Sequence, residues 1–109
     1  MIHRSRDNAA TKGWFTGPWD SPLPVPVGYA RAGVNEPHVH QRMYEVYLVA
    51  TGHGTAVVDG KHVDLKPGDM LTIEPGEVHA FIANSDDYSH FVIQTPYVAG
   101  DKVFVQQRS

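Results

Sequence analysis

Short turn signals divide this chain at frequent intervals, and none of the segments between them shows a helical apolar period. The 109 residues include ten glycines and eight prolines, which fall at intervals as turn residues do. Asp59-Gly60, between apolar-rich runs at 55–58 and 61–65, is a strong hairpin signal. Many short strands with this spacing are typical of an antiparallel sandwich or barrel. The sequence therefore predicts an all-β fold.

The expected strands are bounded by these turns. The clearest strand covers 44–51. Val27, Tyr29 and Arg31 are predicted on one strand face, because side chains two residues apart in a strand point the same way. Proline at alternate positions keeps 21–26 extended and excludes a central strand there. We expect strands at 27–32, 44–51, 55–58, 61–65, 70–73, 79–83 and 88–95, with a further edge strand at 102–105.

The length suits a single domain and leaves no room for two. Residues 1–13 are polar and basic, and we expect a flexible N-terminal tail there. A single domain is then predicted over 14–109, with its core at 25–105. The segment Trp14–Trp19 holds three large aromatic side chains without helical spacing. These side chains could cap one end of the core or cover a neighbouring subunit, since tryptophan serves in both settings.

Composition and charge exclude several classes of protein. The chain has no cysteine, which rules out a disulfide scaffold, a thiolate nucleophile and an iron–sulfur cluster, and fits a reducing compartment. Its 9 basic and 12 acidic residues are mixed along the chain, so no basic stripe is available for nucleic acid. The apolar runs are too short to span a membrane, and the N-terminus lacks the apolar region of a signal peptide. We expect a cytoplasmic protein.

One stretch of the chain combines the residue types of a metal site. His38 and His40 are two residues apart, so in extended backbone both rings point to one face. Glu45 can add a carboxylate oxygen, and His79, beside a later turn, is a fourth candidate. Mixed nitrogen and oxygen ligands suit one divalent transition metal, namely Fe, Mn, Ni, Co or Zn, and leave positions open for water or substrate. If these were merely polar residues near turns, several ionisable groups would be buried without partners, which is costly.

The spacing of these residues resembles the two motifs of the cupin superfamily, in its small single-domain form. The first motif reads G-x4-H-x-H-x4-E-x6-G over 33–52, and the second reads G-x6-P-G-x2-H-x4-N over 68–84. The resemblance implies a double-stranded β-helix, or jelly-roll barrel. It also implies that one metal ion is bound by His38, His40, Glu45 and His79.

Further residues are candidates for lining a substrate pocket. His90 and Gln94 share one face of their predicted strand, and Tyr47 shares a face with Glu45. The guanidinium of Arg31 would suit a carboxylate or phosphate, although a surface charge is an alternative of at least equal weight. The complete set of pocket candidates is Tyr29, Arg31, Tyr47, Phe81, His90 and Gln94.

The ligand set favours an enzyme, with other functions left open. A bound metal could act as Lewis acid on a small polar molecule such as a sugar, a keto acid or another oxygenated compound. With Fe(II), the open positions could instead take O2, as in a dioxygenase. The alternative is a non-catalytic binding or sensor module in which the metal holds the ligand or the fold. No catalytic residue is assigned, although Glu36 and Glu77 could serve as a general base or as partners of a ligand histidine.

The expected partners are a small-molecule ligand or substrate and a second copy of the chain. A jelly roll of this size leaves open sheet edges, which a partner subunit can cover. The aromatic segment Trp14–Trp19 also favours a homodimer, because its side chains could cover a neighbouring subunit.

Overall fold

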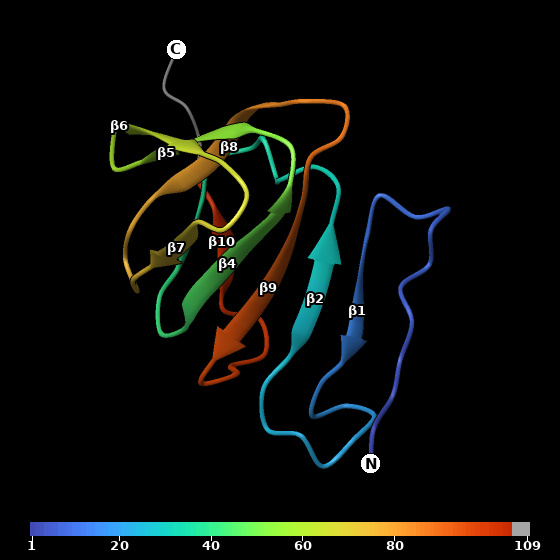
Figure 1. Ribbon diagram of the computed structural model, residues 1–109. Helices are drawn as coiled ribbons and strands as arrows, with labels where there is room; N and C mark the ends of the chain where they lie inside the picture. The colour runs from blue at the N-terminus through green and yellow to red at the C-terminus, as the bar shows by residue number, and fades with distance from the viewer. Residues whose placement is uncertain (106–109) are drawn as a thin grey trace.

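Ten β-strands form two antiparallel sheets in the computed structural model, which describes residues 1–105 (Figure 1). The first sheet contains, in spatial order, β1 (Lys12–Thr16), β2 (Val27–Ala30), β9 (Ser89–Thr95), β4 (Tyr44–Thr51) and β7 (Met70–Ile73). The second contains β10 (Lys102–Phe104), β3 (His38–His40), β8 (His79–Asn84), β5 (Gly54–Val58) and β6 (Lys61–Leu65). The described part of the chain has no helix that is long and apolar enough to cross a membrane.

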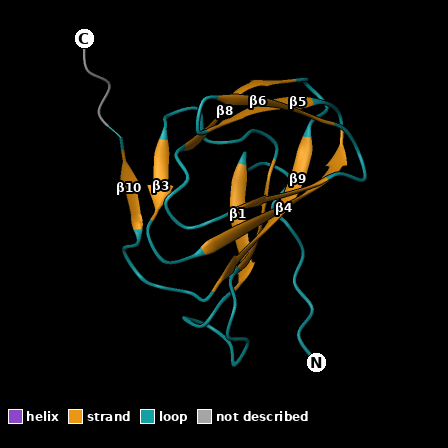
Figure 2. Cartoon of the chain, turned by 90° about the vertical axis from the view of Figure 1, so that its left-hand side faces the viewer, coloured by secondary structure: helices purple, strands orange, loops and turns teal. Residues whose placement is uncertain are grey.

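The two sheets close around a common interior (Figure 2). From β3 onward the chain passes repeatedly between the sheets, which is the winding of a double-stranded β-helix. This confirms the predicted fold class. Apolar side chains from both sheets fill the interior, because each strand turns alternate residues inward. The buried core cluster consists of Tyr47, Val49, Ala56, Leu65, Ile73, Phe81 and Tyr88.

The hairpin between β5 and β6 forms at the predicted Asp59-Gly60 turn. Val58 lies opposite Lys61 in the ladder, so the two turn residues make the whole connection. Both have positive φ, 47° at Asp59 and 81° at Gly60, as a type I′ turn requires. Aspartate and glycine are among the residues that adopt this backbone at low cost, which explains why the local sequence specifies this hairpin.

A β-bulge in β8 changes the predicted alternation of its side chains. Ala83 lies opposite Thr55, whereas Phe81 lies opposite the next residue, Ala56, so Ile82 has no partner on β5. The extra residue reverses the strand face beyond it. Phe81 is therefore buried, whereas Ile82 and Ala83 are both exposed. A regular alternation along the strand expected at 79–83 would put His79, Phe81 and Ala83 on one face, and the bulge removes Ala83 from that face.

The N-terminal residues are tied to the first sheet. Strand β1 begins at Lys12, so the predicted domain boundary at residue 14 falls inside a strand. Before it, the backbone N–H of Asp7 donates to the Tyr29 hydroxyl over 3.0 Å. The guanidinium of Arg4 lies 3.1 Å from the Asp20 carboxylate. Both side chains of that ion pair are well exposed, so it contributes little to stability.

Candidate metal centre and its cavity

Four buried side chains from both sheets converge on one point. His38 and His40 lie on β3 and point inward together, and His79 stands directly opposite His38 across the ladder to β8. Glu45 reaches the same point from β4 of the facing sheet. Each residue offers one ligand atom, and these atoms all lie within 4.8 Å of one another. The structure thus brings together the four residues that the sequence predicted as ligands.

Backbone carbonyls orient two of the histidine rings. Nδ1 of His38 lies 2.9 Å from the Glu36 carbonyl oxygen, and Nδ1 of His79 lies 3.0 Å from the Glu77 carbonyl oxygen. A carbonyl oxygen only accepts, so each Nδ1 carries a proton, and in the neutral ring Nε2 then keeps its lone pair. Glu36 and Glu77 therefore support ligand histidines, as the sequence allowed, but through their backbones and not their carboxylates. This arrangement is common for metal-binding histidines.

Both carboxylate oxygens of Glu45 are held by neighbours. The Tyr47 hydroxyl donates to Oε1, and the Gln94 side-chain amide donates to Oε2 over 2.9 Å. Nε2 of His79 lies 3.3 Å from Oε1, and Nε2 of His40 lies 3.3 Å from Oε2. Burial alone would raise the pKa of Glu45, but these polar contacts hold the pKa well below its usual range. The carboxylate is therefore ionised at neutral pH.

The donor set fits a metal ion on two structural observations. Within residues 1–105, neither buried ring nitrogen of His40 makes a hydrogen bond, although Nε2 lies 3.3 Å from Oε2 of Glu45, and such a group is costly in a protein interior. Nε2 of His79, whose lone pair is free in the neutral ring, also faces the Glu45 carboxylate. The Nε2 lone pair of His79 and Oε1 of Glu45, 3.3 Å apart, would repel each other without a cation between them, either a metal ion or a proton on the ring. A divalent cation coordinated by one ring nitrogen of His40, by Nε2 of His79 and by the Glu45 carboxylate would give each of these atoms a partner.

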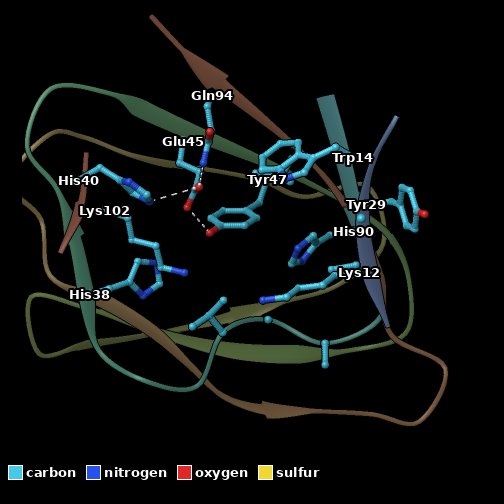
Figure 3. Close-up of a pocket in the computed structure, with 16 residues that line it drawn as sticks. Lys12, Trp14, Tyr29, His38, His40, Glu45, Tyr47, His90, Gln94 and Lys102 are labelled. Atoms are coloured by element: carbon cyan, nitrogen blue, oxygen red, sulfur yellow. Dashed lines mark hydrogen bonds and ion pairs between the residues drawn. The ribbon is translucent and has the colours of Figure 1, made fainter. Parts of the chain in front are cut away.

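A cavity of about 500 Å³ opens beside the four residues, on the inner face of the first sheet. Figure 3 shows His38, His40 and Glu45 at one side of this cavity and His90 toward the other. Gln94 and Tyr47 are both held against the Glu45 carboxylate, and Figure 3 shows the Tyr47 ring between Glu45 and His90. The ligand cluster is therefore open to a small molecule from the cavity.

His90 is a neutral polar group in the cavity wall. Burial lowers the pKa of His90 to about 4, so the ring is uncharged at neutral pH. Its Nδ1 lies 2.7 Å from the buried Tyr88 hydroxyl, which can donate or accept. Nε2 is therefore the nitrogen left for a ligand.

The predicted pocket residues divide into two groups. Tyr47, His90 and Gln94 have inward-facing side chains and line the cavity. Phe81 lies behind them in the core, with its ring centroid 5.2 Å from that of Tyr47. Tyr29 borders the cavity, but its ring points away from it (Figure 3) and packs on Phe15.

The structure also places Arg31 outside the cavity. Strand β2 ends at Ala30, and the exposed Arg31 guanidinium donates to the Ala10 carbonyl over 3.1 Å. Tyr29 and Arg31 were pocket candidates, with a surface charge as the alternative for Arg31. Ala30 is instead the residue opposite His90 and shares its inward face. A face cannot be assigned from one strand alone, because a shift of one residue reverses every side chain.

Two lysines and a tryptophan that line the cavity were not among the pocket candidates. Lys12 and Trp14 lie on β1 and Lys102 lies on β10, and Figure 3 shows all three at the cavity. Burial and the positive charge of Lys12 both lower the pKa of Lys102. Lys12 fell in the expected tail, just before the aromatic segment Trp14–Trp19, and was not considered for the cavity. Its two-residue spacing from Trp14 was the available signal.

Trp14 lies across the cavity wall because of a glycine on the next strand. Gly28 is the register partner of Trp14, and a Cβ there would come within 2.7 Å of the indole ring. Any larger residue at this position would displace the ring. The indole is nevertheless 44% exposed, which leaves a flat apolar surface at the cavity.

Fold and site together define a double-stranded β-helix protein with a buried cluster of three histidines and one glutamate. The family model described as "Cupin domain" matches residues 27–94, and the chain belongs to this family. The matched residues include all four members of the cluster.

Solved structures of several cupins share this fold. A Streptomyces PAC13 variant with uridine is 19% identical, with coverage of 97% of this chain and 88% of PAC13 at a TM-score of 0.68. PAC13 is described as a nucleoside dehydratase. KdgF from Halomonas sp. is 20% identical over 81% of this chain and 79% of its own, with a TM-score of 0.67. A cupin-like protein of Thermotoga maritima is 22% identical over 86% and 74%, with a TM-score of 0.72.

At these identities the likeness shows the fold alone. A comparison by sequence with curated proteins gives no match.

Proposed function

We propose that this cupin is a metal-dependent enzyme acting on a small, polar, oxygenated molecule bound in the cavity. The observation that carries the proposal is that three of the four ligand candidates, His38, His40 and Glu45, line the cavity wall. A purely structural metal site is closed by its protein ligands, whereas a catalytic site keeps a position open to its substrate. A cavity of about 500 Å³ lies within the usual range for small-molecule sites.

The four cluster residues would hold the metal, which when bound would supply Lewis-acid polarisation of a substrate oxygen. Gln94 and Tyr47 fix the Glu45 carboxylate, so that it need not reorganise when a ligand arrives. His90 offers a neutral ring nitrogen as a hydrogen-bond partner for a hydroxyl or carbonyl of the substrate. Trp14 offers an apolar surface to the carbon skeleton.

Turnover in the presence and absence of metal tests the proposal. We would incubate the metal-loaded protein with sugars, keto acids and, given the fold shared with PAC13, nucleosides such as uridine. We expect turnover of one class, lost on chelation and restored by adding metal back. Turnover that survives full metal removal would refute the metal-dependent mechanism. Tight binding of one compound without turnover would identify a binding or sensor module.

We further propose that two copies of the chain associate and that the protein acts in the cytoplasm. Trp14, Trp19 and Tyr97 form an edge-to-face aromatic chain with centroid separations of 5.8 and 5.6 Å. All three rings keep more than a third of their surface exposed, which supports a partner at this position. The lack of cysteine supports a reducing compartment.

A further inference from the structure

Two lysines from opposite ends of the chain face the same cavity. Lys12 lies on β1 and Lys102 lies on β10, at the edges of the two sheets. Figure 3 shows both side chains extending into the cavity from different sides, with their nitrogens toward its interior.

Strand register fixes both lysines on inward-facing positions. Lys12 pairs with Ala30, which in turn pairs with the inward-facing His90. Lys102 pairs with the ligand candidate His40. Directly paired residues share a face of the sheet, so the backbone itself directs both lysines toward the cavity.

Among residues 1–105, no carboxylate forms an ion pair with the ammonium group of Lys12 or of Lys102. The one carboxylate in the cavity wall, Glu45, is already held by Tyr47 and Gln94. A divalent metal on the cluster would make the cavity more positive still. Both lysines are exposed, and two positive charges that face one space favour the binding of an anion between them.

We propose that Lys12 and Lys102 bind an oxyanion, namely the carboxylate or phosphate group of a substrate. The other oxygens of this substrate face the cluster of three histidines and Glu45. This inference rests on the proposed function and narrows its substrate to an anionic, oxygenated molecule. Both lysines lie outside residues 27–94, so the feature belongs to this chain's end strands and not to the part that matches the family. It assigns anion binding to residues other than Arg31, one candidate for that role, whose exposed side chain lies outside the cavity.

Binding of matched charged and neutral probes tests this inference. The probes are glycerate and glycerol 3-phosphate, with glycerol as their uncharged counterpart, each titrated into isotopically labelled protein and followed by NMR. We expect at least one of the two anions to bind more tightly than glycerol does, by about tenfold or more, as a charge-assisted contact implies. The tighter of the two anions identifies the carboxylate or the phosphate as the natural group. Equal binding of anions and glycerol would overturn the inference.

Charge-removing variants assign that preference to the two lysines. Lys12→Gln with Lys102→Gln should abolish the preference for anions, and the matched pair Lys12→Arg with Lys102→Arg should keep it. Lys61→Gln on β6, exposed and outside the cavity, serves as the control and should bind as the unmodified protein does. An unchanged preference in the double glutamine variant, with its thermal midpoint unchanged, would contradict the assignment.

The titrations are run on metal-free and on zinc-loaded protein, because an anion could also bind the metal directly. A lysine-dependent preference in the metal-free protein supports the inference even if no metal binds. Metal binding with no lysine-dependent preference would overturn this inference and leave the proposed function standing.

Discussion

Gln94 donates a hydrogen bond from Nε2 to Oε2 of Glu45 over 2.9 Å, and the two residues are direct register partners on β9 and β4. The ladder therefore positions the amide opposite the carboxylate before any ligand is bound. Gln94 leaves Oε1 to Tyr47 and His79, so each oxygen of Glu45 has a fixed direction. Such outer partners hold a ligand carboxylate in place and tune its metal affinity.

The Gln94→Met substitution tests this support, because it keeps the length of the side chain and removes its donor. We expect metal affinity to fall by about tenfold to a hundredfold with the fold retained. Competition with a chelator measures the affinity, and circular dichroism checks the fold. Gln41→Met, at an exposed loop position, is the matched control. Equal affinity in the two variants would show that the Gln94 amide does not support the metal.

Substituting one of the ligand histidines should remove the gain in stability that added metal gives. A metal that binds only the folded state stabilises it by about 2.7 kcal/mol when present at about 100 times its dissociation constant. We expect His40→Ala and His79→Ala to lose this gain in thermal midpoint on metal addition. His62→Ala changes an exposed histidine on β6 and should keep the full gain. An equal gain in all three variants would place the metal elsewhere.

The metal-free protein should lose stability as the pH falls from about 6.5 to about 4. Burial lowers the pKa of His38 and of His90 to about 4, whereas an unfolded histidine titrates near 6.5. Between these values the unfolded chain binds more protons, so the free energy of unfolding decreases with falling pH. Urea unfolding at several pH values measures the slope. His90→Gln should reduce it, and a flat profile in the unmodified protein would refute the prediction.

Sedimentation should show a dimer. The exposed Trp19 and Tyr97 rings, which do not line the cavity, would be covered by a second copy, and Trp19→Ser should weaken that association. Analytical ultracentrifugation over a range of concentrations gives the mass and its concentration dependence. A monomeric mass at the highest concentration would exclude this role for the aromatic chain.

The parts of the fold that local chemistry specifies were predictable. Asp59-Gly60 specifies its hairpin by backbone preference. The spacing of His38 and His40 directs both rings to one face, and Glu45 adds a third ligand candidate from the next strand. These features depend on residues close in sequence, so they can be read without knowing the partner strands.

The orientation of the cavity wall could not be predicted in the same way. Whether Tyr29 or Ala30 faces inward depends on the pairing of β2 with β9, which is a long-range property. The contribution of Lys12 depends on β1 joining the sheet edge, and the exposure of Ala83 depends on a bulge against β5. Register and bulges follow from the packing of the whole barrel, which local alternation does not report.

Metal content is the most direct test of a shared site at His38, His40, Glu45 and His79. The protein would be purified without a metal-affinity step, and elemental analysis would be run on it, on His40→Ala and on the His62→Ala control. We expect about one divalent transition metal ion per chain in the unmodified protein and the control, and almost none in His40→Ala. No stoichiometric metal in the unmodified protein after reconstitution, or equal metal in all three proteins, would contradict a metal centre at these four residues.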